Sequence, residues 1–211
     1  MVLSHEEKEQ QRRFAFERLR RQYLVSHALV RDVLSRYAPV APQDWRFQAN
    51  SYGRPSIAEP AGWRGLRFNL SHTDGRAVVA VAWEVDIGVD VEGLRDLDDL
   101  SQIVEQFFSP IEVAQLRSRP EWFYDFWTLK EAYIKARGMG LAIPLHTFSF
   151  NLADPALPTI MFHQGCDDLA ERWQFFLRRG EGYRIALAAP MGPKHPISVL
   201  ETEVVPLTGA V

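Results

Sequence analysis

The stretch Trp122–Leu141, WFYDFWTLKEAYIKARGMGL, predicts one long helix that faces a core along most of its length. Pro120 suits the first helical position, where its missing N–H is not needed, and Gly138 suits the residue just past the helix end. The side chains expected to be buried are large and apolar: Phe123, Phe126, Trp127, Tyr133 and Ile134. We expect the rest of the chain to be organised around this helix.

One acid and one base interrupt its apolar pattern. Glu131 and Lys135 are four residues apart and share a face of the helix, with Trp127 one turn earlier on that face. An exposed Glu–Lys pair at this spacing adds only about 0.3–0.5 kcal/mol and is very common. Because aromatic residues are dense around this pair, a freely solvated face is a poorer explanation here. A chemical role requires partners elsewhere in the chain.

Composition limits the classes of protein to consider. The 211 residues suffice for one large or two small domains, and 46% apolar with 24% charged residues is ordinary for a globular protein. The net charge of −3 gives no reason to expect a nucleic-acid partner. No apolar run is long enough to span a membrane, and the N-terminus lacks a secretory h-region. The single Cys166 excludes an internal disulfide, so we expect a cytoplasmic protein.

The pattern elsewhere mixes helices and strands. Ser4 and Glu7 have the spacing of a capping box for a short first helix, and an apolar stripe over 14–37 predicts a long second one. Asp74-Gly75 predicts a hairpin between two strands. Residues 97–116 predict a helix that breaks and restarts at Ser109-Pro110. Later strands are predicted at 147–152, 159–163, 172–178, 182–188 and 197–205. Both halves run from a long helix to several strands, which suggests a two-lobed pseudo-repeat.

Two polar clusters stand out besides the central helix. The second helix carries several arginines, which are either a solvated basic face or a phosphate clamp. In VDIGVDVEGL, period-two alternation puts Asp90 and Glu92 on one face of a strand and Ile87, Val89 and Val91 on the other. Two neighbouring carboxylates repel each other unless they are exposed or a cation lies between them. Hard oxygen ligands favour Mg²⁺, with Mn²⁺ possible, over zinc.

Three blocks in order carry a resemblance to a known family. They are Gly53-Arg54-Pro55 followed by FNLSH, then IGVDVE, then FFSPIE with FWTLKEAYIKARGMGL. Together they cover roughly Asn50 to Leu141. The chain resembles the 4′-phosphopantetheinyl transferases, and specifically the larger, surfactin-synthetase-activating (Sfp-like) type, because Glu92 follows Asp90 in a D-x-E pattern.

The resemblance implies an α+β fold with two similar α/β lobes in one chain, at 1–90 and 91–211, and an active site in the cleft between them. It implies Mg²⁺-dependent transfer of the phosphopantetheine arm of coenzyme A (CoA) to a serine of an apo acyl carrier protein or peptidyl carrier domain, releasing 3′,5′-ADP. The carriers would belong to fatty-acid or secondary metabolism. We expect a monomer that acts on neither nucleic acid nor membrane. The alternative is a catalytically silent carrier-binding module of the same fold.

The resemblance also implies roles for single residues. Asp90, Glu92 and Glu131 match the metal ligands, and Glu131 and Lys135 match the catalytic pair. The expected CoA contacts are Arg54, Ser71, His72, Lys130, Arg31, Arg21 and Arg18. The chain departs from the family at Gln10, where another phosphate-binding arginine is expected. An unrelated nucleotide hydrolase would more often show a G-x-x-x-x-G-K-[ST] loop, and this sequence has none.

Overall fold

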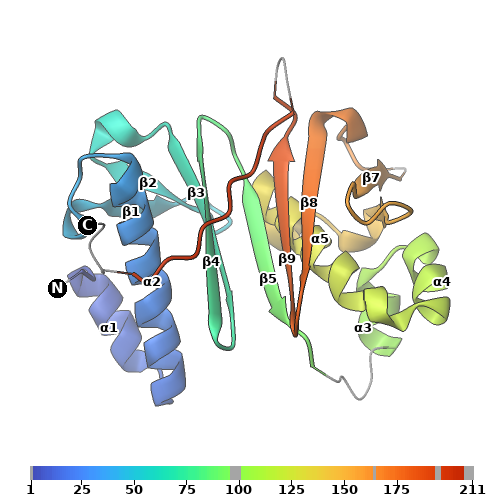
Figure 1. Cartoon of the computed structure of the whole chain (residues 1–211), viewed down its shortest axis with the longest axis horizontal. Helices are drawn as coiled ribbons and strands as arrows, with labels where there is room; N and C mark the ends of the chain where they lie inside the picture. Colours follow the sequence, from blue (N-terminus) through green and yellow to red (C-terminus); the bar gives the residue numbers. More distant parts are fainter. Residues whose placement is uncertain (1, 96–100, 164, 193–195, 207–211) are drawn as a thin grey trace.

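The computed structural model describes residues 2–95, 101–163, 165–192 and 196–206, which form two groups of elements side by side (Figure 1). The N-terminal group comprises α1 (His5–Arg13), α2 (Glu17–Tyr37), β1 (Arg46–Ala49), β2 (Pro55–Glu59), β3 (Leu66–Thr73) and β4 (Arg76–Trp83). The C-terminal group comprises β5 (Gly88–Gly93), α3 (Ser101–Phe107), α4 (Pro110–Ser118), α5 (Phe123–Arg137), β6 (Phe148–Asn151), β7 (Thr159–Phe162), β8 (Trp173–Gly180) and β9 (Tyr183–Pro190).

Local sequence signals set most ends of the N-terminal elements. The predicted capping box is present, with Ser4 accepting from the backbone of Glu7 and Glu7 accepting from that of Ser4. The predicted hairpin is also confirmed, because β3 and β4 pair antiparallel around Gly75, whose φ of 73° favours glycine. α2 packs on this hairpin, and their shared core contains Leu34, Trp45 and Phe68.

In the C-terminal group, α5 lies against a three-stranded antiparallel sheet in the order β5-β9-β8. The predicted helix and its end at Gly138, which has a φ of 65°, are confirmed. Its predicted start needs correction, because Pro120 opens a separate 3-10 turn over Pro120–Trp122 and α5 begins at Phe123. Phe126, Leu129 and Tyr133 are completely buried in its core. α4 restarts at the predicted capping box of Ser109 and Glu112. The predicted helical residues 97–100 lie outside the described part of the chain.

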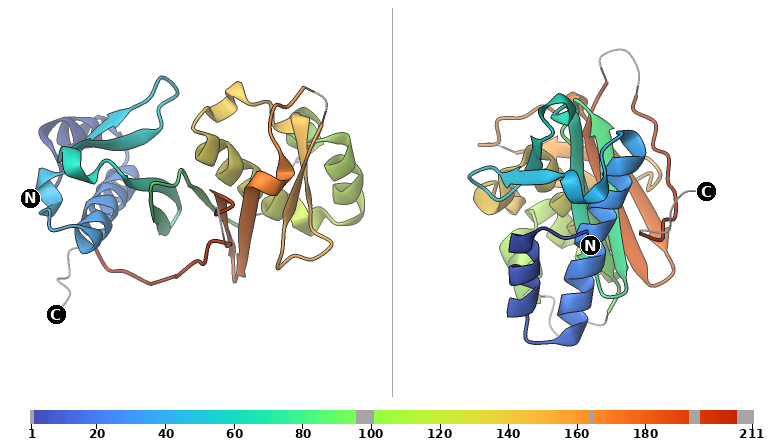
Figure 2. Two further views of the ribbon diagram at one scale, coloured as in Figure 1. Left: turned by 90° about the horizontal axis from the view of Figure 1, so that it is seen from above. Right: turned by 90° about the vertical axis from the view of Figure 1, so that its left-hand side faces the viewer.

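The two groups have separate hydrophobic cores. One core draws on residues between Val30 and Val81, and the other on residues between Ile103 and Ala188. The predicted mixed fold with two lobes is therefore confirmed (Figure 2). The predicted boundary at 90/91 needs correction, because it cuts β5, whose six residues all pair with β9. Among the described helices, none is long and apolar enough to cross a membrane.

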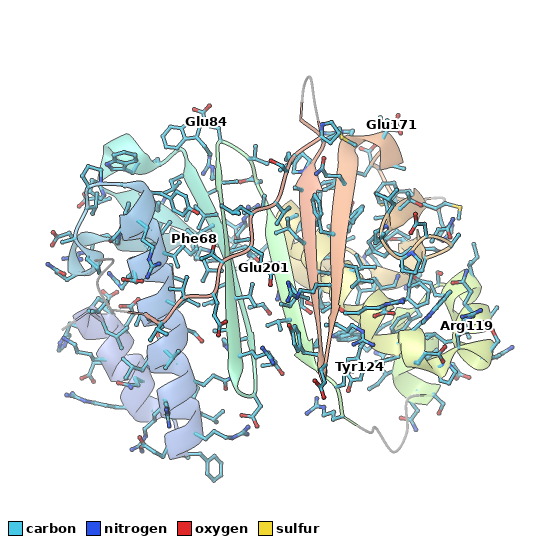
Figure 3. All side chains as sticks on the ribbon, viewed as in Figure 1. Phe68, Glu84, Arg119, Tyr124, Glu171 and Glu201 are labelled. Atoms are coloured by element: carbon cyan, nitrogen blue, oxygen red, sulfur yellow. The ribbon has the colours of Figure 1, made fainter. Side chains whose placement is uncertain are left out.

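The C-terminal segment, described at 191–192 and 196–206, connects the lobes on one face. It leaves β9, crosses the front of β4 and reaches α2, with Glu201 over the junction (Figure 3). The strand predicted at 197–205 was wrong, because the described residues there join no sheet. Their backbone is held by a side chain instead: Gln174 donates to the carbonyl of Ile197 and accepts from its N–H. Arg178 adds an ion pair to Glu201.

Candidate active site

A cavity of about 420 Å³ lies where β3, β5 and α5 meet, at the junction of the lobes. It is lined by Leu70, Ser71, His72, Asp90, Val91, Glu92, Trp127, Glu131 and Lys135. The three predicted metal ligands, the predicted catalytic pair and the predicted Ser-His pair are thus all brought together. They come from the C-terminal end of β3, from β5 and from one face of α5, which are three separate parts of the sequence.

Lys135 connects the three elements. Its ammonium donates to Oδ1 of Asp90 at 2.6 Å, to the hydroxyl of Ser71 at 3.1 Å and to the carbonyl of Val89 at 3.3 Å. The hydroxyl of Ser71 in turn donates to Oδ1 of Asp90 at 2.8 Å. The helix lysine and the strand carboxylate are therefore held in one charge-assisted network rather than facing solvent.

The three carboxylates repel one another in a partly desolvated site. Burial, followed by repulsion from Asp90, raises the pKa of Glu131 to about 7, against the opposing effect of Lys135. Burial and Asp90 also raise the pKa of Glu92, although a hydrogen bond from Trp127 opposes this shift. A carboxyl group whose pKa lies close to neutral pH is suited to accept a proton there.

The chemistry of these side chains fits a hard divalent cation. Carboxylate oxygens are the ligands that Mg²⁺ prefers, and Oδ2 of Asp90 is buried without a hydrogen-bond partner among the described residues. A cation beside that oxygen would satisfy it and relieve the repulsion among the three acids. Within the described ranges, no three His, Cys, Asp or Glu side chains are close enough to hold a metal ion as they stand. The carboxylates thus supply the right donors but not a closed ligand shell.

His72 and Lys135 are the cationic candidates that line this cavity. Burial lowers the pKa of His72 below its ordinary value, and the positive charge of Lys135 lowers it further. The neutral imidazole is therefore favoured near neutral pH, and it can still donate one hydrogen bond to an anion.

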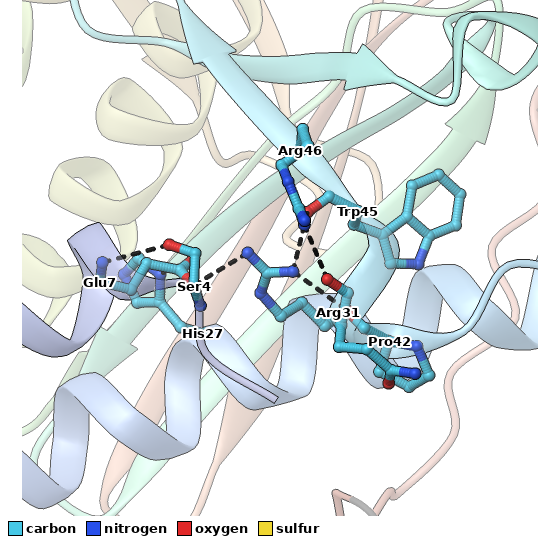
Figure 4. Close-up of polar contacts among 8 residues, drawn as sticks. Ser4, Glu7, His27, Arg31, Pro42, Trp45 and Arg46 are labelled. Atoms are coloured by element: carbon cyan, nitrogen blue, oxygen red, sulfur yellow. Dashed lines mark hydrogen bonds and ion pairs between the residues drawn. The ribbon is translucent and has the colours of Figure 1, made fainter. Parts of the chain in front are cut away.

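Arg31, an expected CoA contact, is a structural residue instead. Its guanidinium is buried and donates to the carbonyls of Pro42 and Trp45 and to the carboxylate of Glu7 (Figure 4). Glu7 also contacts His27 at 3.1 Å. This network fastens α1 and the segment before β1 to α2, and Arg31 is not among the residues that line the cavity.

Lys130 also needs correction. Its side chain is completely buried in the C-terminal lobe, where it pairs with Glu112 at 2.8 Å and donates to the carbonyls of Leu145 and Phe148. Lys130 and Lys135 are five residues apart and so lie on different faces of α5. The first faces the core and does not line the cavity, whereas the second does.

Arg54 connects the lobes rather than lining the cavity. It donates to the carbonyl of Ala136 at 2.8 Å, and its side chain forms an ion pair with Asp86 at 3.1 Å. Neither Arg18 nor Arg21 lines the cavity either. Arg18 forms an exposed ion pair with Asp74, and Arg21 is exposed on α2. The expectation of a CoA phosphate clamp on these arginines is therefore not supported by their placement.

Besides the aliphatic Leu70 and Val91, one residue that lines the cavity, Trp127, was not predicted as a site residue. Trp127 lines the cavity and hydrogen-bonds to Glu92. The signal was present in the sequence, because Trp127, Glu131 and Lys135 follow one another at intervals of four residues and share one helix face. Aromatic residues at helical spacing usually belong to a core, however, and the neighbouring Phe123 does, with its ring stacked on that of Trp127.

Comparisons with known proteins identify the family of the chain. A family model described as the 4′-phosphopantetheinyl transferase superfamily matches residues 86–188. A second, described as 4′-phosphopantetheinyl transferase, N-terminal, matches residues 1–84. The two models meet just before β5, where strand pairing also puts the boundary between the lobes.

Individual relatives support the same assignment. The chain is 38% identical to 4′-phosphopantetheinyl transferase HetI of Nostoc over 67% of this chain and 62% of the relative. It is 34% identical to Sfp of Bacillus subtilis over 71% of this chain and 66% of the relative. A further 4′-phosphopantetheinyl transferase of Bacillus subtilis is 32% identical over 78% and 73%. The chain thus spans less than two thirds of the length of each of the first two relatives. By these matches it belongs to the 4′-phosphopantetheinyl transferase superfamily, as a member of the Sfp-like type.

Proposed function

We propose that the protein transfers the 4′-phosphopantetheine arm of CoA to a serine of an apo acyl carrier protein or peptidyl carrier domain. One observation carries the proposal. In a chain of this superfamily, the cavity between the lobes gathers three carboxylates with Lys135, Ser71 and His72. A site that only bound a carrier would gain nothing from one buried and two half-buried acids that repel one another.

The proposed reaction balances without a further reactant. The serine oxygen of the carrier bonds to the β-phosphorus of CoA, and the bond from that phosphorus to the bridging oxygen of the pyrophosphate breaks. The products are the phosphopantetheinyl carrier and 3′,5′-ADP. The serine gives up its proton, and the leaving phosphate carries away the bonding electron pair. Such transfers depend mainly on positioning and on the stabilisation of negative charge.

Glu131 is the proposed base for the serine proton. Its pKa of about 7 keeps a large deprotonated fraction at neutral pH, and it lies in the same cavity as the other acids. Lys135 would stabilise the leaving phosphate by its charge, and the imidazole of His72 would donate a hydrogen bond to a phosphate oxygen. Ser71 would act through Asp90, to which its hydroxyl already donates.

Asp90, Glu92 and Glu131 are the proposed holders of Mg²⁺. When bound, the ion would neutralise phosphate charge and polarise the phosphoryl group. The donor set and the unpartnered Oδ2 of Asp90 support this assignment.

Intact-mass spectrometry tests the function. An apo carrier protein is incubated with the chain, CoA and Mg²⁺, and the expected result is a mass gain of one phosphopantetheine that disappears when EDTA is added. No gain on any of several fatty-acid, polyketide and peptide-synthetase carriers, with CoA still bound, would favour the silent binding module. A chain that binds no CoA would refute the proposal.

A further inference from the structure

β3 and β5 are joined by side chains rather than by a backbone ladder. Asn69, Ser71 and Thr73 of β3 each accept a hydrogen bond through a side-chain oxygen. The donors are the backbone N–H groups of Val89 at 2.8 Å, Val91 at 3.2 Å and Gly93 at 3.2 Å. We call these three hydrogen bonds the seam. Each pair is separated by 20 positions, so the two strands run parallel and in step.

The seam is the polar junction between the sheets of the two lobes. In the described residues, β3 pairs only with β4, and β5 only with β9. The N–H groups of Val89 and Val91 are buried, and a buried N–H without a partner is strongly unfavourable. The seam donors are every second residue of β5, so along the strand they flank Asp90 and Glu92.

The central hydroxyl of the seam is already fully used. Ser71 donates to Asp90, and it accepts from the N–H of Val91 and from Lys135. A hydroxyl offers one donor and two acceptor positions, so no further strong bond is available to it. The hydrogen bonds of Ser71 therefore fix the position of Asp90 relative to β3. The two outer seam bonds, at Asn69 and Thr73, hold the rest of β5 in the same register.

Thr73 forms the seam bond closest to Glu92. Its hydroxyl accepts from Gly93, the residue directly after Glu92, and its carbonyl accepts from the side chain of Gln22 on α2 at 2.8 Å. One residue thus links the long helix of the N-terminal lobe, the end of β3 and the end of β5. Asn69 holds the other end of the seam and is itself buried.

We propose that Asn69 and Thr73 are positioning residues, which fix the register of β5 against β3 and so hold Asp90 and Glu92 at the height of Ser71 and His72. Neither side chain lines the cavity, so neither acts on the substrate directly. The inference rests on the proposed transfer reaction, in which small displacements of acids across a cleft lower the rate steeply.

The test compares Thr73→Val, which keeps the shape but removes the acceptor, with Thr73→Ser, which keeps the hydroxyl. In Thr73→Val we expect amide hydrogen exchange at Gly93 to accelerate roughly 3- to 10-fold, the effect of one lost hydrogen bond, while exchange at Val91 stays unchanged. We expect kcat to fall on the order of 10-fold with the KM for CoA unchanged. Thr73→Ser should keep the wild-type values of kcat and of hydrogen exchange at Gly93.

A substitution on β5 should disturb the same hydrogen bond between Gly93 and Thr73. A Cβ on Gly93 would lie 3.3 Å from the hydroxyl oxygen of Thr73, so in Gly93→Ala that hydroxyl must shift by a few tenths of an ångström, and we expect kcat to fall as in Thr73→Val. In Asn69→Leu the buried N–H of Val89 loses its hydrogen-bond partner, so this variant is informative only if it folds. The comparison of Thr73→Val with Thr73→Ser is therefore the decisive test.

The outcomes separate the two proposals. If the wild type is active and Thr73→Val and Thr73→Ser have equal kcat values, the positioning role is overturned but the proposed function is not. A loss of activity that only matches the loss of folded protein would overturn that role as well. A wild-type chain that transfers no phosphopantetheine would overturn the proposed function and the positioning role with it. Unchanged exchange at Gly93 in Thr73→Val would show that the seam bond does not form.

Discussion

Lys135 on α5 holds one oxygen of Asp90 on β5 at 2.6 Å, and the other oxygen of the same carboxylate is buried without a partner among the described residues. Among the described residues, only one of the two carboxylate oxygens of Asp90 therefore has a hydrogen-bond partner. The lysine fixes its position across the junction of α5 and β5, and one oxygen stays available for a further ligand. Glu92 and Glu131, which line the same cavity, supply negative charge that favours a cation as that ligand.

Glu131→Gln should abolish transfer without unfolding the protein. Loss of a general base lowers the rate about 10²- to 10⁴-fold, and glutamine keeps the size of the side chain. Carrier modification measured by mass spectrometry, with CoA binding as the control, tests the base role. Wild-type turnover by this variant would remove Glu131 from that role.

The same variant should be more stable than the wild type at pH 8 in EDTA. Burial and the neighbouring acids raise the pKa of Glu131 from 4.5 to about 7, so stability falls as the pH rises between these values and the folded carboxyl group is forced to ionise. Removing the charge should add about 1–3 kcal/mol to the free energy of unfolding at pH 8 and almost nothing at pH 4. Urea unfolding at both pH values measures the difference, and a variant less stable than the wild type at pH 8 would contradict it.

Mg²⁺ should stabilise the wild type in the absence of CoA. A ligand that binds only the folded state at 100 times its Kd adds about 2.7 kcal/mol to the free energy of unfolding. Asp90→Asn should abolish the effect, because it removes the carboxylate with the unpartnered oxygen. Asp154→Asn, at an exposed turn, is the matched control. Equal stabilisation of all three proteins would place the metal elsewhere.

Lys130→Met should destabilise the fold rather than weaken CoA binding. The substitution leaves Glu112 charged and unpaired inside the C-terminal core, and breaking a buried pair in this way costs about 3–5 kcal/mol. Arg117→Met, exposed on the neighbouring α4, should change the free energy of unfolding by less than about 0.5 kcal/mol. A variant of normal stability with a raised KM for CoA would restore Lys130 as a CoA contact.

Stability should fall at acid pH through Glu7. Burial raises the pKa of Glu7, but hydrogen bonds from His27 and the Ser4 backbone, together with the charge of Arg31, lower it to about 2 overall. Because the folded pKa lies below the ordinary value of 4.5, the stabilisation is complete above pH 4.5 and disappears as the pH falls towards 2. The loss is up to about 3 kcal/mol.

Glu7→Gln should flatten this part of the pH profile of unfolding, whereas Glu6→Gln, at an exposed position of the same helical turn, should not. Identical slopes for the two variants would mean that the network in Figure 4 does not stabilise the protein in solution.

Gly138→Ala should disturb the contact between the lobes. A Cβ there would lie 2.7 Å from Cδ of Arg54, and the φ of 65° disfavours alanine. Gly140→Ala isolates the backbone effect, because Gly140 also has a positive φ, while the described residues beyond its chain neighbours place no atom within 4 Å of the added Cβ. Destabilisation by Gly138→Ala should exceed that by Gly140→Ala, and the excess should disappear in the Arg54→Ala background. Purely additive effects would rule out the coupling.

The local elements could be predicted from the sequence because their causes are local. The capping boxes at Ser4 and Ser109, the turn at Gly75 and the left-handed residue at Gly138 each depend on a few neighbouring residues. Alternation along 87–92 likewise put Asp90 and Glu92 on one face, and both line the cavity. The predicted strand at 197–205 failed because its backbone is held by the distant Gln174 rather than by a neighbouring strand.

The sequence by itself determined which residues carry charge at this site and which helix and strand faces present them. Only the tertiary structure decided what each charged group contacts. Lys130 and Lys135 belong to the same helix, yet one pairs with Glu112 in a core and the other with Asp90 at the cavity. The reason is physical: helical periodicity sets the direction of a side chain, but the partner it meets is brought there by a segment far away in the chain.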